Sequence, residues 1–206
     1  MQTGPTIRYA RKRRGDYLME QSDLLRHVCT VLENLGLPYL ITGSQATIAF
    51  GEPRFTNDID IVVSLGFDQL DAFIKSFPAE EFYLSREAAQ DAIARRSMFN
   101  IIHPTSGLKI DVIIPGSSDF ERGRFERGRK VRVAPDFIAI FASPEDVILK
   151  KLQFFKMGGS DKHLRDIAGV MKVSSAMIDR EYIELYAEQF GVADLWQRVL
   201  KDLERH

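Results

Sequence analysis

Aspartates lie inside two short runs of apolar, mostly β-branched residues, and this pattern constrains the fold more than any other feature of the chain. Residues 58–63 read DIDIVV, and residues 109–114 read KIDVII. A buried carboxylate is costly unless a cation or a metal ion compensates for its charge. Side chains two residues apart on a strand share a face, so Asp58 and Asp60 point the same way, and Asp111 joins them if the two strands are neighbours.

The three acids are candidate ligands of a metal ion. Carboxylate oxygens clustered on one face are what a hard cation such as Mg²⁺ prefers. Gly43 and Ser44 end an apolar run and precede a short helix predicted over 45–50, so their backbone N–H groups can hold a phosphate. A phosphate cradle beside such acids is suited to phosphoryl or nucleotidyl transfer. The alternative for Asp58 and Asp60 is edge-strand charge that faces water.

Composition excludes several classes of protein. The 206 residues suffice for one sizeable core, and a net charge of -1 gives no overall attraction to nucleic acid or to a membrane surface. The single Cys29 excludes an internal disulfide and fits a reducing compartment, so we expect a cytoplasmic protein. No set of Cys and His residues suggests zinc, and neither a signal peptide nor a run long enough to span a membrane is visible.

Periodicity predicts an α/β (α+β) fold. Residues 98–103 and 108–114 are expected to form a hairpin. From Ser143 onward the pattern is helical, beginning with a Ser-Pro-Glu-Asp start signal. Further helices are expected over 17–35, 67–77 and 86–96, and further strands over 38–42, 58–63, 81–84, 131–133 and 137–140.

These elements predict three parts of the chain. Residues 1–16 form a basic flexible arm, 17–142 an α/β core, and 143–206 a helical subdomain packed on that core. The run RKRR at 11–14 is either part of a solvated terminus or a nucleic-acid contact.

Three strings carry a resemblance to a known family. They are TGSQA followed by GEPRFTNDIDI within 42–61, SPEDVILKKL at 143–152, and GGSDKHLRDI at 158–167. The chain resembles the DNA-polymerase-β-like nucleotidyltransferase superfamily, and in particular its small prokaryotic AbiEii-related branch. The resemblance implies a mixed-sheet core with a C-terminal helical subdomain, and transfer of a nucleoside monophosphate from an NTP to an acceptor with two Mg²⁺ ions.

The resemblance also implies roles for residues. Asp58 and Asp60 would bridge both metal ions, and Asp111 would bind the catalytic one and accept the proton of the acceptor. Gly43 and Ser44 would hold the β- and γ-phosphates of the nucleotide.

Several cations and one acid are candidate nucleotide contacts. Arg54 and Lys109 either grip phosphate or compensate for the acids. Lys151 borders an apolar helical stripe, so it is either a core-edge lysine or the nucleotide contact that the resemblance implies. In the next predicted helix, Lys162 and Asp166 share a face that is either a nucleotide contact or a salt-bridged surface.

These candidates predict a cleft. Helices from 143 to about 172 should form one wall, with Lys151 and the face of Lys162, Arg165 and Asp166 looking toward Asp58. Removing the Lys151 side chain should then weaken nucleotide binding and spare thermal stability. His163 is either a base or a helix cap.

Three functions are compatible with the sequence. The first is a Mg²⁺-dependent nucleotidyltransferase whose acceptor (tRNA, protein or small molecule) is unidentified. Such an enzyme would resemble a toxin, and its partner would be RNA or a cognate antitoxin. The second is an antibiotic-type nucleotidyltransferase that acts on a small hydroxyl compound. The third is a non-catalytic nucleotide-binding regulatory protein, which the intact acids and the Gly-Ser pair argue against.

Overall fold

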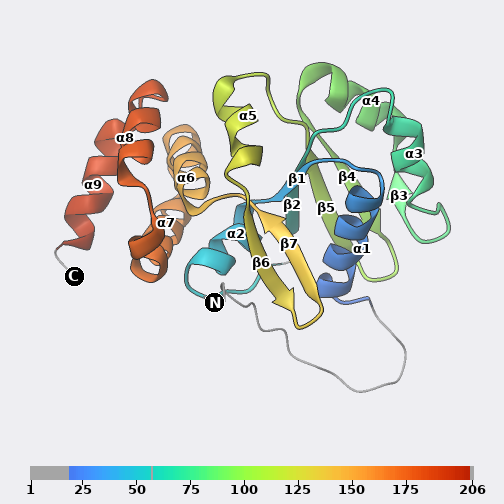
Figure 1. Cartoon of the computed structure of the whole chain (residues 1–206), viewed down its shortest axis with the longest axis horizontal. Coiled ribbons are helices and arrows are strands. Elements are labelled where there is room, and N and C mark those ends of the chain that lie inside the picture. Colours follow the sequence, from blue (N-terminus) through green and yellow to red (C-terminus); the bar gives the residue numbers. More distant parts are fainter. Residues whose placement is uncertain (1–18, 57, 205–206) are drawn as a thin grey trace.

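A computed structural model describes residues 19–56 and 58–204, so the predicted basic arm at 1–16 lies outside the described residues. Within that part, the strands form one seven-stranded mixed sheet in the order β3-β4-β5-β2-β1-β7-β6 (Figure 1). The α/β prediction is therefore confirmed. The strands are β1 Tyr39–Ile41, β2 Asp58–Val63, β3 Tyr83–Leu84, β4 Met98–His103, β5 Leu108–Ile113, β6 Arg129–Ala134 and β7 Phe137–Phe141.

The centre of the sheet brings the two acid-bearing strands together. Strands β2 and β5 are parallel neighbours, with Asp60 opposite Asp111 and Asp58 opposite Lys109. Strand β4 pairs antiparallel with β5, as the predicted hairpin requires. The alternating residues Ile59 and Ile61 are fully buried, so one face of β2 packs in the core and the opposite face carries Asp58 and Asp60.

Helices cover the sheet from two sides. Helices α1 (Gln21–Asn34), α3 (Leu70–Lys75) and α4 (Arg86–Arg95) lie beside the β3–β5 half, at the right in Figure 1. Helix α3 begins later than predicted, because residues 67–69 form a turn. Helices α2 (Gly43–Phe50) and α5 (Asp119–Glu126) lie near the centre.

The C-terminal helices gather at the opposite side (Figure 1). They are α6 Pro144–Gly158, α7 Asp161–Ser174, a 3-10 turn Ser175–Met177, α8 Arg180–Gln189 and α9 Ala193–Leu203. Helix α6 starts as predicted, because the Ser143 hydroxyl accepts a hydrogen bond from the Asp146 N–H at 3.2 Å. No helix in the described part of the chain is long and apolar enough to cross a membrane.

Helix α7 is docked closely on the end of α2. A Cβ atom at Gly51 would lie 2.8 Å from the Thr47 carbonyl oxygen and 3.0 Å from the Val170 nitrogen. The Ser174 hydroxyl donates a 2.6 Å hydrogen bond to the Phe50 carbonyl oxygen. These contacts hold α7, the helix that carries Asp166, against the helix that begins at Gly43.

Candidate functional site

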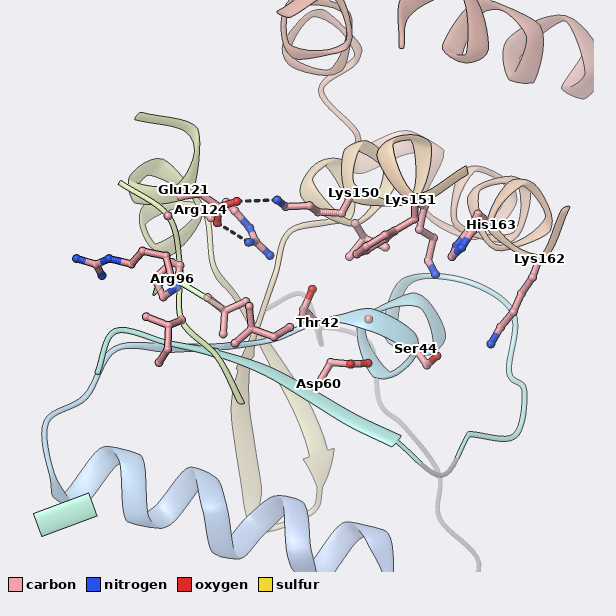
Figure 2. A pocket seen from close by; sticks show the side chains of 18 residues that line it. Thr42, Ser44, Asp60, Arg96, Glu121, Arg124, Lys150, Lys151, Lys162 and His163 are labelled. Carbon is pink, nitrogen blue, oxygen red and sulfur yellow. Dashed lines mark hydrogen bonds and ion pairs between the residues drawn. The ribbon is translucent and has the colours of Figure 1, made fainter. Parts of the chain in front are cut away.

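A cavity of about 370 Å³ lies between the sheet and helices α2, α5, α6 and α7 (Figure 2). Predicted residues Gly43, Ser44 and Asp60 form one side of it, and Lys151 and Lys162 face them. The remaining lining comes from Thr42, Val62, Arg96, Ile113, Ile114, Pro115, Gly116, Glu121, Arg124, Val147, Lys150, Phe154 and His163.

Asp60 and Asp111 form the acidic part of the site. They are register partners on adjacent parallel strands, whereas Asp58 is exposed at the start of β2. Burial raises the pKa of the Asp60 carboxyl, and the charges of Asp111 and Asp58 raise it further. A hydrogen bond from the Ser44 backbone N–H acts in the opposite direction. The acids repel each other, so a cation bound between them would be stabilised.

Gly43 is pressed against Asp60. Its φ is +56°, a left-handed conformation that glycine adopts without steric cost. A Cβ atom at this position would lie 2.0 Å from Asp60 Oδ2. The backbone that starts α2 therefore needs glycine for two reasons, and it places the predicted phosphate cradle directly beside the acid.

Asp111 is held by two neighbours in this structure. Its Oδ1 accepts from Lys109 Nζ at 3.0 Å and from the Asn100 side-chain amide. Lys109 thus compensates for the acids, one of the two roles that the sequence left open. Among the described residues, no group of three or more His, Cys, Asp or Glu side chains is arranged to hold a metal ion. Asn100 was not predicted from the sequence, although the hairpin register pairs it with Asp111.

A buried ion network joins the phosphate cradle to the C-terminal helices. Asp166, which is 7% exposed, accepts from Lys151 Nζ at 2.6 Å and from Arg54 Nε at 3.1 Å. Arg54 Nη2 also donates to the Ser44 hydroxyl at 2.7 Å. Burial opposes ionisation of Asp166, but Lys151 and Arg54 outweigh it and hold the pKa of this carboxyl below its usual value. The salt-bridged surface considered for Asp166 is thus a buried network instead.

Lys151 is more deeply buried than a core-edge lysine. It is 7% exposed, and burial lowers the pKa of its amino group although Asp166 opposes this shift. Figure 2 shows Lys151 and Lys162 pointing from the helices toward Ser44. Lys162 also lines a second hollow of about 350 Å³, together with Arg54, Arg165 and Asp166.

The Lys151–Asp166 pair changes the expectation that loss of the lysine spares stability. Replacing Lys151 by Met leaves Asp166 with Arg54 alone, and we expect the free energy of unfolding to fall by about 2 kcal/mol. Denaturant unfolding of Lys151→Met, Asp166→Leu and the double variant measures the coupling. The double variant should lose less than the two single losses together, and a Lys151→Met variant as stable as the wild type would contradict the prediction.

His163 lies at the edge of the cavity. Its ring stacks on Phe154, with centroids 5.8 Å apart, and its Nδ1 is buried without a hydrogen-bond partner in the described part of the chain. Burial and then the charge of Lys151 lower the pKa of the imidazole, so the ring is neutral near pH 7. The stacking assigns it a place in the wall of the cavity, and neither a cap nor a base is required to explain it.

Helix α5 supplies a wall that was not predicted from the sequence. Glu121 pairs with Arg124 of the same helix and with Lys150 of α6. Lys150 lies on the side of α6 that faces α5, and it lines the cavity. The spacing of Glu121 and Arg124 signals an i,i+3 pair, whereas nothing local in the sequence signals Lys150 as its partner.

Comparisons with known proteins support the fold. No protein-family model and no curated protein sequence matches the chain. A solved antigenic nucleotidyltransferase-like protein from Paracoccidioides brasiliensis is similar, with 17% identity, a TM-score of 0.51, and coverage of 73% of this chain and 75% of that chain. The antibiotic-resistance factor ANT(2'')-Ia has 14% identity, a TM-score of 0.51, and coverage of 90% and 96%.

The lincosamide antibiotic adenylyltransferase LnuA, solved with lincomycin, has 13% identity and a TM-score of 0.51, with coverage of 77% of this chain and all of that one. At these identities the likeness shows the fold, which is that of nucleotidyltransferase-like proteins. The narrower resemblance to the AbiEii-related branch stays a prediction.

Proposed function

We propose that the protein is a nucleotidyltransferase that moves a nucleoside monophosphate from an NTP to a hydroxyl group of an acceptor, with Mg²⁺. The observation that carries the proposal is the contact of the Gly43–Ser44 turn with Asp60, beside Asp111 on the next strand. It joins a phosphate-binding backbone to paired acids, of which Asp60 lines a cavity that Lys151 and Lys162 also line. The nucleotidyltransferase-like fold supports the same reaction.

The carboxylate oxygens suit magnesium by their chemistry, although the described side chains are not grouped as a ready-made metal site. Burial raises the pKa of Asp60 most, and repulsion from Asp111 and Asp58 raises it further, a repulsion that a bound divalent cation would relieve. Asp58, Asp60 and Asp111 would hold two Mg²⁺ ions. Asp111 would then release its ion pair with Lys109 and bind one of the ions instead. When bound, the ions would neutralise the charge that develops on the transferring phosphate.

The residues of the chain have separate tasks in this proposal. Backbone N–H groups of Gly43 and Ser44 would hold the β- and γ-phosphates, with the Ser44 N–H exchanging Asp60 for a phosphate oxygen, and Lys151 and Lys162 would complement the phosphate charge. The acceptor oxygen attacks the α-phosphorus, a new P–O bond forms, and the bond to the leaving pyrophosphate breaks. Asp111 takes the proton of the acceptor hydroxyl, directly or through water.

A small hydroxyl compound is the second candidate acceptor. The solved structures of LnuA with lincomycin and of ANT(2'')-Ia with adenylyl-2''-tobramycin favour this class, because each holds a small antibiotic compound on a similar fold. Transfer to RNA or protein, a cognate antitoxin, and a cytoplasmic location remain predictions from the sequence.

Incubation with each α-labelled NTP tests the proposal. The purified chain is mixed with Mg²⁺ and with lincomycin, tobramycin, RNA or cell lysate as acceptor, and labelled product and pyrophosphate are measured. We expect pyrophosphate release and labelling of at least one acceptor, both abolished by EDTA. Binding of NTP without any Mg²⁺-dependent release of pyrophosphate would instead indicate the regulatory protein, and no NTP binding would contradict both.

A further inference from the structure

The end of the cavity away from Ser44, Lys151 and Lys162 carries a cluster of three charges (Figure 2). Glu121 Oε2 accepts from Arg124 Nη1 at 2.7 Å, and Glu121 Oε1 accepts from Lys150 Nζ at 2.6 Å. Figure 2 shows this cluster spanning from α5 to α6 above Thr42, apart from Lys151 and Lys162. We call these three residues the α5 cluster.

The α5 cluster has more positive than negative charge. Burial opposes ionisation of Glu121, but Arg124 and Lys150 outweigh it and hold its pKa below the usual value, so one carboxylate faces two cations. Arg124 is only 3% exposed, and its Nε has no hydrogen-bond partner among the described residues. Glu121 therefore satisfies only part of the hydrogen-bonding capacity of this buried guanidinium.

We propose that the α5 cluster binds an anionic group, a phosphate or a carboxylate, of the acceptor. This inference rests on the proposed function. Arg124 offers a planar set of donors that suits such groups, and Lys150 adds a second charge. The carbon skeleton of the acceptor would lie on the apolar residues Val62, Ile113 and Pro115, which line the same cavity.

The nucleotide does not supply this anion. Its negative charge resides on the phosphates, and the cradle of Gly43 and Ser44 with Lys151 and Lys162 is placed for them on the other side of the cavity. The sugar and base of an NTP are uncharged near pH 7. An anion at the α5 cluster must therefore come from the second substrate.

The charge of the α5 cluster would select among acceptors. A polyamine such as tobramycin would meet like charge at Arg124 and Lys150, and so should be a poor acceptor. A hydroxyl compound that carries a phosphate should be a good one. A small phosphorylated sugar and the end of an RNA strand share this chemistry.

Titration with inorganic phosphate tests the α5 cluster. The full chain is first saturated with a non-hydrolysable NTP analogue and Mg²⁺, and phosphate binding is then measured by calorimetry. We expect one phosphate to bind, about tenfold more weakly in Lys150→Gln. Lys156→Gln is the matched control, because Lys156 lies on the same helix and reaches the Phe190 and Gly191 carbonyl oxygens instead of the cavity.

Three results would overturn the proposal. They are absence of phosphate binding, equal binding in Lys150→Gln and the wild type, and loss of analogue affinity in Lys150→Gln, which would place the nucleotide at the cluster. Arg124→Lys keeps the charge but removes the planar donors, so it should weaken phosphate binding without unfolding the chain. Ribose 5-phosphate and an RNA dodecamer, used as competitors, distinguish the two sources of phosphate.

Failure of the proposed function gives a different result. If the NTP analogue does not bind, the nucleotidyltransferase proposal fails. The phosphate titration of the free chain still tests the α5 cluster, because Lys150→Gln leaves Gly43 and Ser44 unchanged.

Discussion

Replacing Asp60 by asparagine is expected to reduce nucleotide transfer by about a thousandfold. Asp60 lies at the meeting point of the Gly43 turn, Asp111 and the cavity, so its charge is needed for any cation that serves both phosphate and acids. Steady-state kinetics with Mg²⁺ measure the loss. Asp68→Asn, at an exposed position, is the matched control and should keep wild-type activity. A variant with full Mg²⁺-dependent activity would refute the role of Asp60.

The same substitution should stabilise the metal-free protein in a pH-dependent way. The folded-state pKa of Asp60 is raised above its unfolded value, so ionising Asp60 opposes folding as pH rises through the raised pKa. A neutral amide at this position would remove that cost, so the Tm of Asp60→Asn in EDTA should exceed the wild-type Tm near neutral pH. The difference should vanish below about pH 4, where both folded and unfolded carboxyls are protonated. A difference that persists there would contradict this cause.

Alanine at position 43 is expected to have the second largest effect, a loss of transfer of about a hundredfold together with reduced stability. The added Cβ would both disfavour the φ of +56° and lie 2.0 Å from Asp60 Oδ2, so Asp60 or the α2 turn must move. Kinetics and thermal unfolding of the variant measure the two effects.

Gly107 provides the control for backbone strain. Its φ is +70°, but a Cβ atom there would have no neighbour within 4 Å. Gly107→Ala should therefore lose stability as Gly43→Ala does, yet keep its activity. Equal activity losses in the two variants would show that the contact with Asp60 is unimportant.

Local pattern predicted the elements that carry the acids. Alternation in residues 58–63 and 109–114 predicted that Asp58, Asp60 and Asp111 share one face of the sheet. Strands β2 and β5 pair in parallel with Asp60 opposite Asp111, which is the register that a shared face requires. The start of α6 was predictable for the same reason, because the Ser143 cap is a local interaction. Such features depend on neighbours within a few residues, which a sequence displays directly.

Pairings between distant elements were not predictable. Arg54 reaches Asp166 across 112 positions, and Lys150 reaches Glu121 across 29. Such partners depend on how helices dock on the sheet, which composition and periodicity do not encode. The burial of Lys151 was missed for this reason, since a helical pattern shows which face is apolar but not which acid lies across from it.

Asp166 occupies the position of a substitute anion. It keeps Arg54 and Lys151 extended toward Ser44 when no phosphate is bound, so these two side chains lose their rotational freedom during folding instead of during substrate binding. Each carries about 2 kcal/mol of such freedom. In the proposed reaction a triphosphate would meet a cationic surface that is already ordered, and Asp166 would hold the two side chains in place again after pyrophosphate departs.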